Sequence, residues 1–180
     1  MLYHEMNCDV VSVAYRGYSA SSGVPTEEGL KIDGATVLEY VDSELAEHYI
    51  DRGGVFVLGR SLGGAVAAAS IAGLSQEKLD KIDGLILENT FTSIPDMADR
   101  MFSVLAYFKG LVLTNYWRTI DVVREIELPI NYVTSTFDEI CPMEMTETLY
   151  RASKKSRNLS FWRNNNAGHN DTWIVKKSIY

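Results

Sequence analysis

The sequence predicts an α/β fold in which helices flank a mostly parallel β-sheet. Two observations favour it. Short apolar runs rich in β-branched residues alternate with stretches of helical spacing, which is typical of a parallel sheet covered by helices. Each apolar run also ends in a loop with polar residues, where the ligands of open parallel sheets bind. At 180 residues the chain can bury one globular core, so we expect a single domain over residues 1–180.

The predicted elements alternate along the chain. The apolar runs predict about five strands, over residues 10–14, 55–58, 84–88, 130–134 and 159–162. Thr26 is the expected N-cap of a long amphipathic helix that extends to about Tyr49. A helix over residues 65–72 is rich in small side chains, which would let it approach the sheet closely. Residues 91–127 break the alternation, and their aromatic content predicts a small helical insertion.

Composition and charge exclude several classes of protein. With 46% hydrophobic and 23% charged residues the chain has an ordinary globular composition. Its formal net charge of -7 argues against nucleic acid or an anionic membrane surface as a partner, because both reward clustered Lys and Arg. No apolar segment reaches the ~18 residues of a membrane span. The longest candidate, residues 101–113, is too short and contains Lys109.

Cysteine usage and the start of the chain predict an intracellular compartment. Cys8 and Cys141 are too few for a disulfide framework and lack a second Cys at metal-ligand spacing. We therefore interpret both as free thiols, with pairing of the two as the alternative, and expect no metal site. Met1 is followed by neither a basic region nor an apolar core, so no signal peptide is predicted.

The pattern Gly59-Arg60-Ser61-Leu62-Gly63 predicts a nucleophilic serine. In a G-x-S-x-G turn the serine lies on a strained connection between a strand and a helix, so the residues two before and two after it must lack side chains. The strand predicted upstream and the small-residue helix downstream provide that context. The alternative interpretation is a Gly-rich turn without catalytic use.

A serine nucleophile needs a histidine as base and a carboxylate to orient that histidine, and both follow later strands. Among the three histidines, His169 is the one at a strand's carboxyl end, whereas His4 precedes the first run and His48 lies on the long helix. Asp138 follows the fourth strand, with Glu139 and Asp171 as rival carboxylates. Ser61, Asp138 and His169 thus form a candidate triad that requires no cofactor.

Each partner also has a structural interpretation. Asp138 could be a turn former or a helix cap, and His169 could simply be exposed in its Gly/Asn-rich loop. Arg60 is expected to face solvent or to pair with a carboxylate. For Arg16, which follows the first predicted strand, a structural salt bridge is favoured over a place in the site.

Several stretches together resemble the Bem-type (bud-emergence) branch of the α/β-hydrolases. The similar stretches are Tyr15–Tyr18, Gly23–Asp33, Gly59–Gly64, Glu88–Ile94, Asp138–Pro142 and Gly168–Trp173. The resemblance covers the chain from about Tyr3 to Trp173. It implies a partial α/β-hydrolase sheet, a catalytic triad of Ser61, Asp138 and His169, and a small cap formed by the insertion over about 91–127.

What the resemblance implies for function is a serine hydrolase that acts on an ester or thioester of a small-molecule or acylated substrate. Protein depalmitoylation is a proposed activity of some members, and relatives are usually membrane-anchored. Relatives also place an anchor, three strands and a His-Gly loop ahead of the position where this chain begins, so we expect an N-terminally truncated member. That loop donates one oxyanion N–H, which leaves the Leu62 N–H as the donor in this chain.

Removal of one oxyanion donor costs about 10²- to 10³-fold in rate, so reduced activity is expected. Two alternatives to the esterase remain open. One is a serine peptidase that uses the same residues. The other is a catalytically silent hydrolase fragment or binding module. Oligomeric state and substrate identity do not follow from the sequence.

Overall fold

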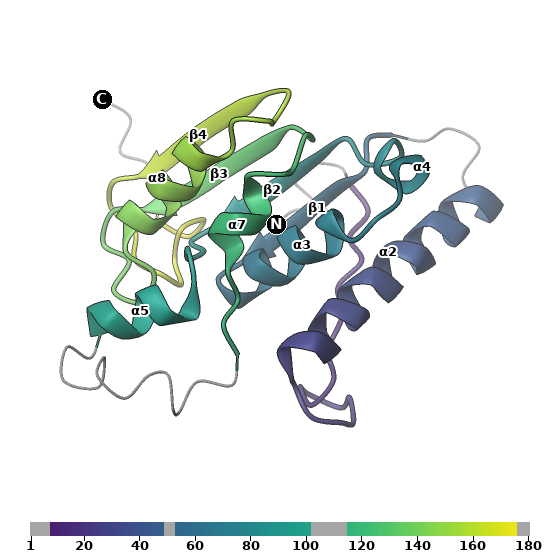
Figure 1. Ribbon diagram of the computed structural model, residues 1–180, viewed down its shortest axis with the longest axis horizontal. Coiled ribbons are helices and arrows are strands. Elements are labelled where there is room, and N and C mark those ends of the chain that lie inside the picture. The colour runs from purple at the N-terminus through teal and green to yellow at the C-terminus, as the bar shows by residue number, and fades with distance from the viewer. Residues whose placement is uncertain (1–7, 49–52, 102–114, 176–180) are drawn as a thin grey trace. The chain divides into compact units, whose positions relative to one another are not determined.

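The computed structural model describes residues 8–48, 53–101 and 115–175. The chain divides into two compact units, residues 1–52 and 53–180, and each is described by itself (Figure 1).

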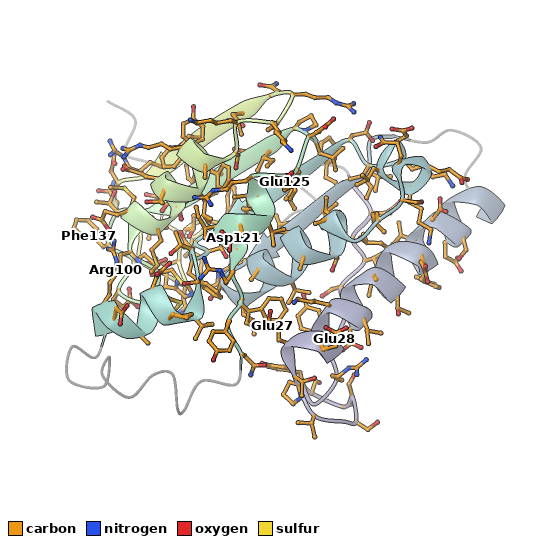
Figure 2. The ribbon with its side chains drawn as sticks, in the orientation of Figure 1. Glu27, Glu28, Arg100, Asp121, Glu125 and Phe137 are labelled. Carbon is orange, nitrogen blue, oxygen red and sulfur yellow. The ribbon has the colours of Figure 1, made fainter. Side chains whose placement is uncertain are left out.

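The first unit contains one long helix, α2 (Glu27–His48). Thr26 caps it, because its Oγ1 accepts a hydrogen bond of 3.1 Å from the Gly29 N–H, one of the first-turn amides without a partner inside the helix. Glu27 and Glu28, labelled in Figure 2, place negative charge in the first turn, where the helix dipole favours it. The predicted cap and helix are therefore confirmed.

Residues 10–14 form no strand in the structure, so this prediction was wrong. Val10, Val11 and Val13 are about half exposed, and the segment is irregular. β-Branched residues favour extended backbone, but a strand also needs a neighbouring edge to bond with. Within the described residues all strand pairing occurs among strands of the second unit.

Arg16 has a structural role, as expected. Its guanidinium donates to Asp33 Oδ1 at 2.8 and 3.0 Å, and its backbone N–H donates to Asp33 Oδ2 at 2.8 Å. These bonds from Arg16 hold the pKa of the Asp33 carboxyl below its usual range. The pair fixes the loop before α2 to the second turn of that helix.

The second unit is built on a parallel sheet. Its strands are β1 (Phe56–Arg60), β2 (Gly84–Glu88), β3 (Ile130–Ser135) and β4 (Leu159–Asn164), in the order β1-β2-β3-β4. Arg60 lies opposite Glu88 at the ends of β1 and β2, and Ser135 lies opposite Asn164 at the ends of β3 and β4. The loops after the strands therefore meet at one edge. The four apolar runs predicted within residues 55–162 are confirmed, and the described sheet has four strands instead of five.

The helices of the second unit form a layer beside this sheet. They are α3 (Leu62–Ala72), α4 (Gln76–Leu79), α5 (Ile94–Met101), α7 (Thr119–Val123) and α8 (Met143–Ala152). Helix α3 packs on β1 and β2, α8 packs on β3, and α7 lies between α3 and α8 (Figure 1). The small residues of α3 are buried, as predicted. The core between these layers comprises Val66, Ala68, Ile71, Leu85, Leu87, Ile130, Tyr132, Met145 and Leu149.

The predicted insertion over residues 91–127 contains α5 and α7. Its central part, residues 102–114, lies outside the described residues. Trp117, which precedes α7, is buried, and α7 contacts α3 and α8. This end of the insertion therefore belongs to the helical layer on the sheet, and a cap over the site stays a prediction.

Candidate active site

Ser61 occupies a strained turn between β1 and α3. Its φ of 54° and ψ of -123° lie in a region that non-glycine residues rarely adopt. The Ser61 N–H donates to the Glu88 carbonyl at 2.9 Å, and Thr90 Oγ1 donates to the Ser61 carbonyl at 2.8 Å. A Cβ on Gly59 would lie 2.3 Å from the Gly63 carbonyl oxygen, so no side chain fits there. The expected strand–turn–helix context is confirmed.

Asp138 and His169 form a buried pair. They come from the loops after β3 and β4, and Asp138 Oδ2 lies 2.7 Å from His169 Nδ1. The Asp138 side chain is 0% exposed and that of His169 is 5% exposed. Asp138 Oδ1 accepts the N–H groups of Ile140 and Cys141 at 2.9 and 2.7 Å. Both carboxylate oxygens thus have fixed partners, which orients the one that faces the imidazole.

The two rival carboxylates bind the backbone of the same loop. Glu139 Oε2 accepts the His169 N–H at 3.4 Å, and Asp171 Oδ1 accepts the Gly168 N–H at 2.6 Å. The hydrogen bonds of Glu139 and Asp171 are with the backbone of the loop that carries His169, whereas Asp138 binds the imidazole ring. Of the other histidines, His4 lies outside the described residues and His48 is the last residue of α2.

The Cys141 thiol, near Ser61, is fully buried. Burial, reinforced by the charge of Asp138, raises the pKa of that thiol to about 12, while the hydrogen bond with Ser61 acts in the opposite direction. The thiol therefore stays protonated at neutral pH. A single Cys after a strand gave no sign of this neighbour in the sequence.

Leu62 begins α3, directly after Ser61. Its N–H belongs to the first turn, where backbone amides have no partner inside the helix and the helix dipole favours negative charge. This end of α3 is therefore suited to an oxyanion, and the role of the Leu62 N–H itself stays a prediction.

Arg60 and Asn89 were not predicted as neighbours of the site. Arg60 Nη2 donates to the His169 carbonyl at 2.8 Å and also to Asn170 Oδ1, and Arg60 Nε lies 3.7 Å from Glu88 Oε1. Asn89 Nδ2 donates to the same His169 carbonyl at 3.1 Å. Arg60 thus pairs with a carboxylate, as expected, but it also holds the histidine loop. The sequence signal that could have found Asn89 is a polar residue placed directly after an apolar strand.

Phe137 projects outward from the loop that carries Asp138. It is 66% exposed and lies at the end of the sheet where β3 ends, as Figure 2 shows. Its backbone N–H donates to the Ala167 carbonyl at 3.0 Å, so the loops after β3 and β4 are joined beside the Asp138–His169 pair. An exposed apolar side chain therefore lies one residue before Asp138 in this loop.

No helix among residues 8–48, 53–101 and 115–175 is long and apolar enough to cross a membrane.

Comparisons with known proteins identify the family to which the chain belongs. A family model described as alpha/beta hydrolase fold matches residues 1–119. The chain is 34% identical over 192 residues to the alpha/beta hydrolase domain-containing protein WAV2 of Arabidopsis thaliana, covering 100% of this chain and 60% of WAV2. It is 39% identical over 178 residues to protein bem46 of Schizosaccharomyces pombe, covering 97% of this chain and 56% of bem46. The chain thus spans less than two thirds of the length of these relatives.

A solved structure supports the same fold. The chain superposes on the esterase Pf2001 of Pyrococcus furiosus with a TM-score of 0.60 at 20% identity, over 88% of this chain and 61% of the esterase. The family match, the two relatives and the parallel sheet agree with one another. The chain belongs to the α/β-hydrolase fold family, in its Bem-type branch.

Proposed function

We propose that this chain is the core of a serine hydrolase that cleaves an ester or thioester through Ser61, His169 and Asp138. The observation that carries the proposal is the buried hydrogen bond of 2.7 Å between Asp138 and His169, at the sheet edge where Ser61 follows β1. Membership of the α/β-hydrolase family supports the same reaction class.

In this mechanism each group has one task. Asp138 binds Nδ1 of His169, which leaves Nε2 to accept the proton of the Ser61 hydroxyl. The Ser61 oxygen then attacks the carbonyl carbon, and the oxyanion that forms faces the Leu62 N–H at the start of α3. His169 returns the proton to the leaving alcohol or thiol, and water activated by the same ring hydrolyses the acyl-enzyme. These steps require no cofactor.

A Ser61 hydroxyl that bonds to the nearby Cys141 thiol turns toward the His169 ring for this reaction. A neutral S–H is a weak hydrogen-bond partner, so exchange for the His169 ring costs little. A second candidate is a catalytically silent hydrolase core in which the Ser61 hydroxyl stays bonded to Cys141. In that case the chain would bind ligands and leave them intact.

The substrate class follows from the proposed chemistry. Esters and thioesters have a leaving group that departs more easily than an amine, so the proposed steps place the smallest demand on the site with these substrates. Phe137, exposed beside Asp138, offers an apolar surface for an acyl chain. The substrate is thus a small acyl ester or an acylated larger molecule.

The test compares Ser61→Ala with substitution of a matched serine on α3, the helix that follows Ser61. Ser70 is buried on α3 and donates to the Val66 carbonyl at 2.8 Å, so Ser70→Ala removes a hydroxyl without touching the site. We expect turnover of p-nitrophenyl butyrate and of an S-acyl thioester by the unsubstituted chain and by Ser70→Ala, and none above background with Ser61→Ala. Equal turnover in both variants, or folded protein without turnover, would overturn the proposal.

A further inference from the structure

The carbonyl of His169 is held from two sides by residues that the reaction itself does not use. Arg60, which directly precedes Ser61 in the chain, donates to this carbonyl at 2.8 Å. Asn89, which directly follows β2, donates to it at 3.1 Å. One acceptor therefore joins the ends of β1 and β2 to the loop after β4. We propose that Arg60 and Asn89 are positioning residues that hold His169 at a fixed distance from Ser61, an arrangement named here the carbonyl clamp.

Asn89 is built into this arrangement. Its side chain is fully buried, and its φ of 44° is a left-handed conformation that Asn tolerates better than most residues. Besides the His169 carbonyl, Asn89 Nδ2 donates to Thr172 Oγ1 at 2.9 Å, and Asn89 Oδ1 accepts the Ser135 N–H at 3.0 Å. The amide therefore has partners on β3 and on both sides of the histidine loop. A rotation of this amide would leave buried donors and acceptors unpaired, so its geometry is fixed.

Arg60 connects the proposed nucleophile to the proposed base. The peptide bond between Arg60 and Ser61 and one hydrogen bond to the His169 backbone separate the two residues. The guanidinium is itself held by Asn170 Oδ1 and lies 3.7 Å from Glu88 Oε1, a carboxylate on a side chain that is only 3% exposed. A charged donor gives a stronger hydrogen bond to a carbonyl than a neutral one. Movement of the turn at Ser61 is thus coupled to movement of the loop that carries His169.

The remaining contacts of the loop explain why the carbonyl matters. The His169 ring has Asp138, and the His169 N–H has only a long bond of 3.4 Å to Glu139. The carbonyl clamp is therefore the strongest described restraint on the His169 backbone. Because a displacement of about 1 Å in a catalytic group can cost about 10²-fold in rate, loss of the clamp should lower kcat. It should leave KM nearly unchanged, since neither residue is placed against the substrate.

The chain offers a matched control for Asn89. Asn164, at the end of β4, is also a buried Asn whose Nδ2 ties the same loop, but it donates to the Thr172 carbonyl at 2.8 Å. Asn89→Ala should reduce stability toward urea more than Asn164→Ala does, because Ala tolerates the left-handed φ at position 89 less well than Asn. If the carbonyl clamp positions His169, kcat falls roughly tenfold in Asn89→Ala, where Arg60 still holds the carbonyl, and less than about threefold in Asn164→Ala.

Arg60 provides a variant that tests the same idea where folding is not at stake, because its side chain is 40% exposed. Arg60→Ala should lower kcat roughly tenfold, since Asn89 still holds the carbonyl. Arg60→Lys keeps one charged donor and should recover part of that loss. Hydrogen exchange of the backbone around residues 168–171 should become faster in Arg60→Ala.

The closing experiment is a double-mutant cycle with p-nitrophenyl butyrate. Because the carbonyl clamp acts through His169, adding Asn89→Ala or Arg60→Ala to His169→Ala should cause no further loss of kcat. The same fractional loss in both backgrounds, or equal kcat losses in Asn89→Ala and Asn164→Ala, would overturn the inference. The inference rests on the proposed function. Turnover that depends on Ser61 but not on the carbonyl clamp would refute the clamp alone, whereas the absence of Ser61-dependent turnover would refute both.

Discussion

Replacement of Asp138 by Asn tests which carboxylate orients His169. Asp138 Oδ1 accepts two backbone N–H groups, at 2.9 Å from Ile140 and 2.7 Å from Cys141. In Asp138→Asn the amide oxygen must keep this position, because an NH₂ group there would face two donors. The amide nitrogen is therefore forced to face His169 Nδ1. An imidazole that accepts a hydrogen bond at Nδ1 carries its proton on Nε2, and this tautomer cannot take the proton of Ser61.

The magnitude follows from that tautomer. The corresponding change in a Ser-His-Asp site lowers kcat by about 10⁴-fold, or about 5 to 6 kcal/mol of barrier. Glu139→Gln is the matched control, because a Gln oxygen can still accept the His169 N–H, and the bond concerned is long, at 3.4 Å. We expect less than about a threefold loss there. Initial rates with p-nitrophenyl butyrate measure both values, and urea unfolding checks that both variants are folded. A larger loss in Glu139→Gln than in Asp138→Asn would refute the assignment of the acid.

Three further predictions concern the turn at Ser61, the buried Thr134 hydroxyl and the buried Cys141 thiol. Gly59→Ala places a Cβ 2.3 Å from the Gly63 carbonyl oxygen, so we expect the variant to lose about 1 to 3 kcal/mol of stability and to react more slowly at Ser61. Thermal unfolding measures the stability, and reaction with a fluorophosphonate measures the labelling of Ser61. An unchanged melting temperature would contradict this prediction. Thr134 Oγ1 is buried and has no hydrogen-bond partner among the described residues, so Thr134→Val should be neutral or stabilising by about 1 kcal/mol in urea, and clear destabilisation would show a missed partner. Burial raises the pKa of the Cys141 thiol to about 12 from an ordinary value of 9.0, so the stability that it contributes is complete below about pH 9 and is lost as the pH rises toward 12. At pH 8 a thiol reagent should therefore modify the exposed Cys8 in the native chain and reach Cys141 only after denaturation; modification of both thiols in the native chain would contradict this.

The local sequence was sufficient to predict those features that depend on residues close together in the chain. The strand at 84–88 is bounded as predicted, because its apolar run is buried on both faces and ends at a polar residue. The turn at Ser61 was predictable because its steric demand falls on residues two positions away. The Thr26 cap followed from the same kind of short-range hydrogen bond.

Prediction from the sequence failed where the structure depends on contacts between residues far apart in the chain. Residues 10–14 have the composition of a strand, yet a strand exists only with a partner edge, and composition does not report one. The choice of Asp138 over Glu139 and Asp171 stayed open for the same reason, since all three lie near His169 in space and the loop geometry selects among them. The contacts of Arg60 and Asn89 with a carbonyl 109 and 80 residues further along the chain could not be predicted from a local pattern.

The most direct test of the central claim is the site at which a fluorophosphonate reacts. After incubation of the folded chain with the probe, peptide mass spectrometry should locate the adduct on Ser61. Labelling should be slowed strongly in His169→Ala and left near its original rate in Ser70→Ala. An adduct on another residue, or no adduct on folded protein, would contradict the claim that Ser61 is a nucleophile activated by His169.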